Sequence, residues 1–97
     1  MKTLSVNYSK GQLFQHVDGG FYKFEKSVWF ADDEDELVIY QHVWPFTKST
    51  WARRSSEFLA KFTPIEKHVL DGARKTKKEI FQAKIAENKK QRRALNQ

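Results

Sequence analysis

The sequence contains no cysteine, only two prolines and four glycines, and no long apolar segment. Without cysteine the chain can form no disulfide, no cysteine–zinc site and no cysteine nucleophile. The longest apolar runs, Val28–Ala31 and Leu37–Tyr40, have four residues each, far below the roughly 20 that cross a bilayer. Nor do the first eight residues contain the continuous apolar stretch of a secretory signal peptide. We therefore expect a cytoplasmic protein without disulfides or a membrane span.

Basic residues are in excess, and the excess is confined to the last third of the chain. Lys and Arg number 18 against 12 Asp and Glu, so the formal net charge is +6. Residues 1–64 hold eight basic and eight acidic side chains, whereas residues 65–97 hold ten and four. Aromatic side chains divide the other way, since 13 of 14 lie in residues 1–64. This division predicts an aromatic-rich β domain over residues 1–62 and a basic C-terminal helix over residues 63–97.

Short apolar segments between turn and loop signals predict four strands in the β region, and apolar residues alternate at period two in the second of them. Asp18-Gly19-Gly20 is a strong turn signal between the first two strands. Lys26 interrupts the apolar face of the second strand, which indicates a bulge or an exposed edge. Leu37–Trp44 is apolar on both faces and is the candidate central strand. The pattern predicts a mainly β fold with α: a small SH3-like antiparallel β barrel or bent sheet, followed by the helix. The expected strands span residues 12–17, 21–31, 37–44 and 51–54.

The C-terminal helix has a local start signal. Thr63 is a good N-cap, Pro64 suits the first helical position, and Glu66 completes a capping box. We expect this helix to begin at Thr63–Pro64, to carry a thin apolar stripe and to fray after about residue 86. A shorter helical turn at residues 57–62 is expected to be capped by a preceding serine, Ser55 or Ser56. The apolar stripe consists of Val69, Ala73, Thr76, Ile80 and Ala83.

Five consecutive acidic residues, Asp32 to Glu36, follow the second strand. Adjacent carboxylates repel one another, so we expect a solvated connection. The segment lacks the ligand positions and the glycine of an EF-hand, which argues against a calcium site. A further role for it is electrostatic docking of the protein's own basic helix.

The sequence contains no recognisable catalytic motif. A Gly-x-Ser-x-Gly motif, a glycine-rich phosphate loop and an isolated carboxylate pair are all missing. His16 and His42 could meet across neighbouring strands, but no His-x-x-x-His spacing indicates a metal site. We therefore expect no enzymatic activity, no catalytic residue, no cofactor and no metal ligand.

One group of residues suggests ligand binding instead. Trp51 and Arg53 share one strand face, and Tyr40 and His42 from the preceding strand would join them in an aromatic and cationic pocket. Such a pocket can stack a base and hold a phosphate. The alternative is that Trp51 and Tyr40 belong to the core while Arg53 pairs with a nearby glutamate, Glu36 or Glu57.

A second group consists of basic residues in the C-terminal helix. Their density suits phosphate contacts and predicts salt-dependent binding of nucleic acid. The helix could instead dock on a protein partner or on a second copy of the chain, or serve only for solubility. Membrane binding is not expected, because the helix lacks a bulky apolar face. The residues expected to contact phosphate are Lys75, Lys77, Lys78, Lys89, Lys90, Arg92 and Arg93.

An ordered series of residues in the β region resembles a known pattern. It comprises Gly11-x-x-Phe14-x-His16, Gly20-x-Tyr22, Ala31 with Glu34 and Glu36, Val38-Ile39-Tyr40, Trp51-Ala52-Arg53 and Phe58. The series is similar to that of the DUF1653 family, a short bacterial and phage domain, over about residues 11–62. The resemblance implies a compact β fold and a small accessory domain without an established activity. Arg54 stands where many members have proline, and the basic helix is not part of the pattern.

Three functions remain open at this point. The first is a non-catalytic module that binds nucleic acid through the basic helix. The second is a phage-type accessory protein that binds and modulates a host or viral protein. The third is a small-nucleotide binder that uses the aromatic and cationic pocket. The expected location is cytoplasmic, in the host if the protein is phage-encoded.

Overall fold

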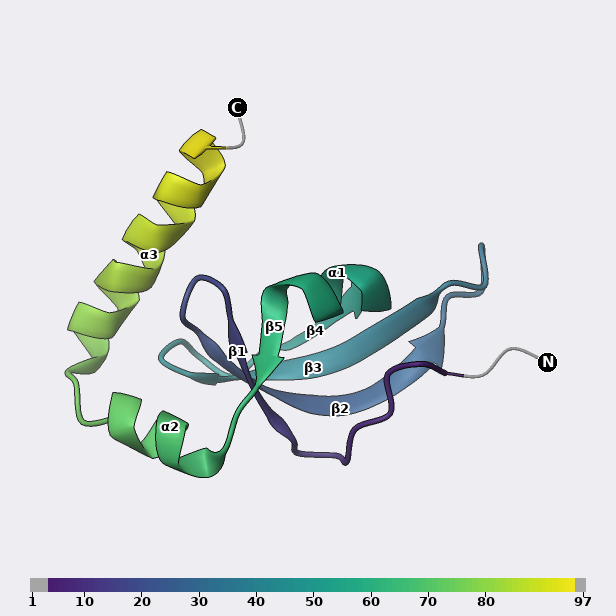
Figure 1. Ribbon diagram of the computed structural model, residues 1–97, viewed down its shortest axis with the longest axis horizontal. Coiled ribbons are helices and arrows are strands. Elements are labelled where there is room, and N and C mark those ends of the chain that lie inside the picture. Colours follow the sequence, from purple (N-terminus) through teal and green to yellow (C-terminus); the bar gives the residue numbers. More distant parts are fainter. Residues whose placement is uncertain (1–3, 96–97) are drawn as a thin grey trace.

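The computed structural model describes residues 4–95, which form one five-stranded antiparallel sheet and three helices, two of them after the last strand (Figure 1). The strands are β1 (Leu13–His16), β2 (Phe21–Trp29), β3 (Glu36–Trp44), β4 (Thr50–Arg54) and β5 (Phe62–Pro64). The helices are α1 (Ser55–Lys61), α2 (Lys67–Ala73) and α3 (Lys78–Leu95). The predicted mainly β fold with a C-terminal helix is confirmed.

The sheet is open, with the strand order β4-β3-β2-β1-β5. β4 and β5 are its two edges, and they do not pair with each other within residues 4–95. β3 is an inner strand, but the middle place belongs to β2, because β5 adds on the far side of β1. The register between β2 and β3 shifts between Phe24 and Lys26. This shift confirms the irregularity that Lys26 predicted.

One face of the sheet carries the aromatic core. Phe58 of α1 lies on this face and stacks on Phe62, with ring centroids 4.4 Å apart. Tyr40 of β3 packs against both rings, at 5.4 and 5.1 Å. Burial of each such side chain contributes about 1.5–3 kcal/mol, so these rings hold the small sheet and α1 together. The buried cluster comprises Val6, Phe14, Phe24, Val38, Tyr40, Phe58 and Phe62.

β5 occupies the residues at which the C-terminal helix was expected to begin. Thr63 lies opposite Gln15 of β1, and Phe62 is buried in the core. Pro64 is tolerated because β5 is an edge strand. The predicted capping box at Thr63 is therefore wrong. A helix cap contributes about 1 kcal/mol, less than burial of a phenylalanine ring combined with the backbone bonds to β1.

The C-terminal region forms two helices instead of one. α2 ends at Ala73 and α3 begins at Lys78, so the predicted apolar stripe is interrupted between them. α3 remains helical to Leu95, which makes the predicted fraying after residue 86 wrong. The last two residues of the expected helix, Asn96 and Gln97, lie outside the described residues. Within residues 4–95, no helix has both the length and the apolar character that crossing a membrane requires.

The start of α1 also differs from the prediction. The helix already contains Ser55 and Ser56, its N-cap residue is Arg54, and no side chain forms a cap hydrogen bond there. The predicted serine cap is wrong because β4 runs directly into the helix. Both serines therefore lie inside its first turn.

The acidic segment after β2 is only partly solvated. Asp33 and Asp35 each accept a hydrogen bond from Nη1 of Arg54, at 2.8 and 2.7 Å. Glu36 is buried and accepts hydrogen bonds from the hydroxyl of Ser5 and from a backbone N–H of the same N-terminal segment. The expectation of five solvated carboxylates is thus wrong for Glu36, because protein donors replace water around it.

Candidate functional site

α3 packs with one face against the end of the sheet that carries the β1–β2 turn (Figure 1). The ring of Phe81 contacts Phe21 and Trp44, with centroid separations of 6.0 and 4.7 Å. Ile85 is buried and lies against Gly19 in the turn. Phe81 and Ile85 are four residues apart and share a helix face. This face anchors the C-terminal helix to the sheet.

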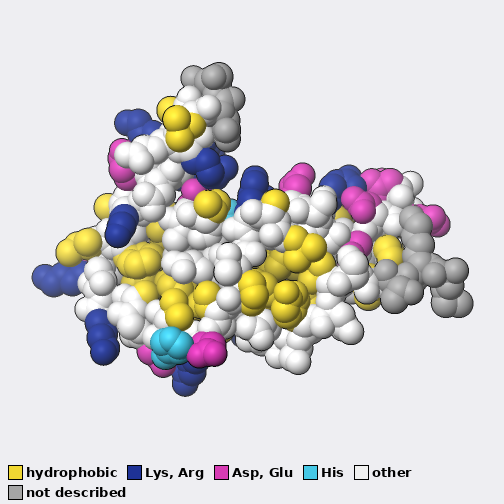
Figure 2. Space-filling view, viewed as in Figure 1, with side chains coloured by type: hydrophobic (Ala, Val, Ile, Leu, Met, Phe, Trp, Pro, Cys, Tyr) yellow, Lys and Arg dark blue, Asp and Glu magenta, His cyan; other side chains and the backbone are white. Residues whose placement is uncertain are grey.

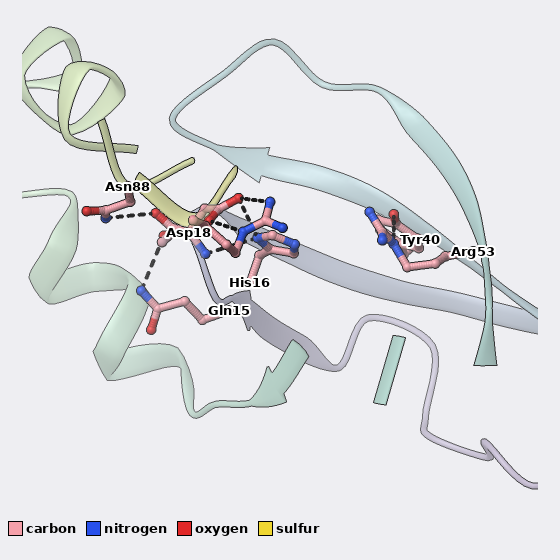
Figure 3. Close-up of polar contacts among 8 residues, drawn as sticks. Gln15, His16, Asp18, Tyr40, Arg53 and Asn88 are labelled. Atoms are coloured by element: carbon pink, nitrogen blue, oxygen red, sulfur yellow. Dashed lines mark hydrogen bonds and ion pairs between the residues drawn. The ribbon is translucent and has the colours of Figure 1, made fainter. Parts of the chain in front are cut away.

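Polar contacts from the same helix hold it in place. Gln82 Nε2 donates to the carbonyl oxygen of Pro45 at 2.8 Å, and Asn88 Nδ2 donates to that of Asp18 at 3.2 Å. The Arg92 guanidinium donates two hydrogen bonds of 2.9 Å to the Asp18 carboxylate. Figure 3 shows Asn88 beside Asp18, next to His16. α3 is therefore joined to the loops at this end of the sheet along much of its length.

The contacts of α3 correct two predictions. Ile80 and Ala83 of the predicted apolar stripe are exposed, whereas Phe81 and Ile85 beside that stripe dock on the sheet. The expected docking of the basic helix on residues 32–36 is also wrong. That segment pairs with β4, and α3 pairs with Asp18 at the other end of the sheet (Figure 1).

A cavity of about 440 Å³ lies between α3 and the sheet. Strands and turns supply one part of its lining, and α3 supplies the rest through Ile85, Lys89, Arg92 and Arg93. Its volume falls in the range of sites that hold small organic ligands. The cavity brings side chains of the predicted aromatic and cationic pocket together with part of the basic helix.

Three of the four residues predicted to form the pocket line this cavity: His42, Trp51 and Arg53. The Trp51 side chain is 55% exposed, and its Nε1 donates to the hydroxyl of Ser49 at 2.7 Å. Tyr40 is instead buried in the core, where its hydroxyl accepts a hydrogen bond of 3.2 Å from Nε of Arg53 (Figure 3). Tyr40 therefore follows the alternative prediction of a core residue, whereas Trp51 does not.

Arg53 has partners of its own at the edge of the cavity. Its guanidinium lies 5.7 Å from the ring centroid of Phe62, and Nη1 lies 3.8 Å from a carboxylate oxygen of Glu57. The pairing with Glu57 that the alternative predicted is thus present beside the cavity lining. A long ion pair at an exposed carboxylate contributes little. The guanidinium consequently remains available to an anion in the cavity.

Three uncharged rings, His16, Tyr22 and His42, form what we call the cavity floor. Tyr22 lies between the two imidazoles, at centroid separations of 6.3 Å from His16 and 4.6 Å from His42. Burial is the main cause that lowers the pKa of each imidazole to about 4. Both are therefore neutral at neutral pH.

The two floor histidines do not meet as neighbours across two strands. His16 belongs to β1 and His42 to β3, and β2 lies between these strands. Among the described residues, 4–95, no group of three His, Cys, Asp or Glu side chains is placed to hold a metal ion.

Asp18 is one of the site residues that the sequence did not reveal, because Asp18-Gly19-Gly20 indicates only a turn. Its side chain is 4% exposed, pairs with Arg92, and lies 3.5 Å from Nδ1 of His16. The hydrogen bonds from Arg92 hold the pKa of the carboxyl below its usual value, although burial opposes them. The signal was present in the spacing. Phe14, His16 and Asp18 alternate at period two, which predicts that they share one face.

The seven predicted phosphate contacts fall into two groups. Three exposed residues lie around the α2–α3 connection, and we call them the junction cations (Lys75, Lys77 and Lys78). Lys78 and Lys89 are about 16 Å apart along the helix axis, given 1.5 Å per residue. The junction cations therefore lie at and before the N-terminal end of α3, whereas the cations that line the cavity lie in its C-terminal part. Figure 2 shows Lys and Arg side chains distributed along this helix.

The second group lies near the C-terminal end of α3. Lys89, Arg92 and Arg93 line the cavity, and Lys90 borders a shallow hollow on the helix beside Lys89 and Arg93. Arg92 is bonded to Asp18. Among the described residues of α3, Lys89 and Arg93 therefore remain as the cations that can contact a ligand in the cavity. We call them the cavity cations.

Searches of family models, curated proteins and solved structures each find no match to this chain. The resemblance to DUF1653 and the phage origin that it suggests stay predictions.

Proposed function

We propose that the protein binds single-stranded nucleic acid, without catalysis, at the cavity between α3 and the sheet. One observation carries this function: a single cavity is lined by the exposed indole of Trp51 and by Lys89 and Arg93, which come from a distant part of the chain. Aromatic rings that stack bases and cations that follow the backbone are the two recurring elements of single-strand recognition.

Trp51 serves as the stacking residue. Its hydrogen bond to Ser49 restrains the indole while more than half of the side chain stays exposed. Phe46 is 42% exposed and adds a second apolar surface to the same cavity. Stacking of one base on an aromatic side chain contributes about 1–3 kcal/mol. An unpaired base can reach this cavity, whereas a base inside a duplex is already stacked and paired.

The cavity cations serve as phosphate contacts. Lys89 and Arg93 are four residues apart and lie on one face of α3, and Arg53 reaches the same cavity from β4. Arg92 has a different role, since its bond to Asp18 holds the helix. The junction cations provide outer contacts for a longer strand.

A free nucleotide is the second candidate ligand. The cavity of about 440 Å³ could hold a small molecule that offers one base and one phosphate. The length dependence of binding separates the two candidates. A strand gains affinity as it reaches the junction cations, whereas a free nucleotide needs the cavity alone.

Filter binding tests the proposed function. We expect an oligonucleotide of about 12 nucleotides to bind more tightly than its mononucleotide, and more weakly at about 200 mM than at about 50 mM salt. Trp51→Ala should lower the affinity about tenfold. The Lys89→Ala, Arg93→Ala double variant should lower the affinity and reduce the salt slope by about 1.4, since each phosphate contact contributes about 0.7.

A matched control removes the same charge elsewhere. The Lys75→Ala, Lys77→Ala double variant also loses two cations, but these lie outside the cavity. It should lose less affinity than the cavity variant. No binding at low salt, or equal losses for the two double variants, would contradict binding at the cavity.

Other expectations stay predictions beside this proposal. They are that the sheet is SH3-like, that the protein is cytoplasmic, and that it binds and modulates a host or viral protein. A homodimer through the C-terminal helix is another. It would need a face of α3 other than the one that carries Ile85, because Ile85 is buried against the protein's own β1–β2 turn.

A further inference from the structure

The cavity floor carries hydrogen-bonding groups that stacking and phosphate contacts leave unused. The backbone N–H of Asp18 donates to Nδ1 of His16 at 3.0 Å, and that of Phe46 donates to Nε2 of His42 at 2.9 Å. A neutral imidazole bears one proton, and it must lie on the nitrogen that does not accept. The backbone therefore sets both tautomers: His16 carries its proton on Nε2, and His42 carries its proton on Nδ1.

Both rings keep this single proton at neutral pH. Burial lowers the pKa of each to about 4. For His16, the nearby carboxylate of Asp18 raises the pKa, while the cations Arg53, Arg92 and Lys61 lower it. Each ring thus offers one donor and has its acceptor occupied.

The two N–H groups belong to histidines that line the cavity. Neither group has a protein partner among the described residues. Within that part of the chain, the fully buried side-chain atom without a partner is Oε1 of Gln41. The histidine N–H groups are therefore accessible to a ligand. A donor removed from water without a partner is unfavourable, so a ligand that enters the floor must supply acceptors.

Gly20 and Tyr22 complete the floor. A Cβ atom on Gly20 would lie 3.2 Å from Cε2 of Tyr22 and 3.3 Å from Cε1 of His42, so the two rings pack more closely on Gly20 than they normally would on a side chain. Burial raises the pKa of the Tyr22 phenol, which stays protonated at neutral pH. Its hydroxyl can donate or accept.

We infer that this floor selects nucleobases with carbonyl oxygens at their pairing edge, such as uracil and thymine, over the amino-bearing bases cytosine and adenine. This selectivity rests on the proposed function. The N–H groups of His16 and His42 can donate to carbonyl oxygens, and the Tyr22 hydroxyl can accept from a ring N–H. An exocyclic amino group would place a donor against these donors and leave both unpaired.

Thymine and cytosine provide the comparison, because both are pyrimidines and cytosine has an amino group where thymine has a carbonyl oxygen. Thymine also carries a proton on N3 and a methyl group on C5, so the floor variants below separate the hydrogen bonds of the histidines from the effect of the methyl group. Oligo(dT) and oligo(dC) of about 12 nucleotides are titrated against the full-length protein at low salt. We expect oligo(dT) to bind at least about fivefold more tightly, the effect of one hydrogen bond. Equal affinities, or a preference for oligo(dC), would overturn the selectivity and leave single-strand binding standing. No binding of either strand would overturn both.

Two substitutions take the N–H away from its position in each imidazole and retain the acceptor, because the amide NH2 that each introduces lies at a different position. His16→Asn keeps an oxygen near the position of Nδ1, and His42→Gln keeps one near the position of Nε2, so each backbone N–H retains a partner. Either variant should reduce the ratio of oligo(dT) to oligo(dC) affinity severalfold. His68→Asn is the matched control, because His68 is exposed on α2. An unchanged ratio in both floor variants would also overturn the inference.

Discussion

Asp18 and Arg92, 74 residues apart in the chain, are joined by two hydrogen bonds of 2.9 Å between carboxylate and guanidinium. The pair connects the β1–β2 turn to the C-terminal part of α3. Lys89 and Arg93 lie within one turn of Arg92 on the same helix. Because Arg92 is held by Asp18, its neighbours reach the cavity that Trp51 lines from β4.

Breaking this pair should loosen α3. Asp18→Asn removes the charge and one of the two acceptors, and we expect a loss of about 2 kcal/mol, as for hydrogen bonds between charged groups. Amide hydrogen exchange should become faster in α3 and change little in β2 and β3. Urea unfolding measures the total loss.

An exposed pair serves as the control for this prediction. Arg54 forms ion pairs with Asp33 and Asp35, and all three side chains are more than 40% exposed. Arg54→Lys should cost much less stability than Asp18→Asn, because surface ion pairs contribute little. Equal losses for Asp18→Asn and Arg54→Lys, with unchanged exchange in α3, would show that Asp18 does not anchor the helix.

Gly20 should be intolerant of a side chain for a steric reason. Its Cβ position lies 3.2 and 3.3 Å from the rings of Tyr22 and His42, and Tyr22 also packs edge-on against Tyr40 and Phe62. These rings have little room to move, so Gly20→Ala should destabilise the protein by about 1–3 kcal/mol. Thermal unfolding checks the change.

Gly72 offers the opposite case in the same chain. It lies inside α2, and a Cβ there would have no atom within 4 Å. Gly72→Ala should therefore leave stability unchanged or raise it by up to about 1 kcal/mol through helix propensity. If Gly20→Ala were as well tolerated as Gly72→Ala, close packing of the floor would not be the reason for glycine at position 20.

Acid should destabilise the protein through the floor histidines. An imidazole has a pKa of 6.5 when unperturbed, and burial lowers the pKa of His16 and His42 to about 4 in the folded state. Between these values the unfolded chain binds protons that the folded chain does not. The two histidines therefore do not reduce the free energy of unfolding above pH 6.5. Their protonation in the unfolded chain lowers this free energy as the pH drops from 6.5 to about 4, and it causes no further loss below about pH 4. Each histidine should account for about 1–3 kcal/mol.

Urea unfolding at several pH values measures this effect. The His16→Asn, His42→Gln double variant should show a shallower fall in stability between pH 6.5 and 4 than the parent protein. Carboxyls with lowered pKa values, such as Asp18 and Glu36, contribute their own loss at lower pH and remain in both proteins. The same pH slope in parent and variant would exclude the histidines as its source.

Much of the sheet was predictable because its signals are local. Short apolar segments located four strands, β1 to β4, and Lys26 marked the register shift in β2. The turn at Asp18-Gly19-Gly20 also followed from residue type, with Gly19 at a φ of 114° that suits glycine. Individual site residues were predictable as well, since His42, Trp51 and Arg53 lie at neighbouring positions of two paired strands.

The errors occurred where a distant segment decided the outcome. The capping box at Thr63 lost to pairing with β1, and Glu36 is buried because Ser5 and its neighbour donate to it. The spacing of apolar residues in the C-terminal helix does not by itself show which face of the helix meets the sheet. Phe81 packs against rings of β2 and β3, and Ile85 packs against Gly19 in the β1–β2 turn.

By itself, the sequence determined β1 to β4, the aromatic core and the confinement of excess positive charge to the last third of the chain. Only the tertiary structure decided that part of this charge lies beside Trp51, and that neutral histidines form the floor between them. Strand periodicity and charge counts are properties of neighbouring residues. The cavity depends on contacts such as Asp18 with Arg92, whose partners are far apart in sequence and meet only when the chain folds.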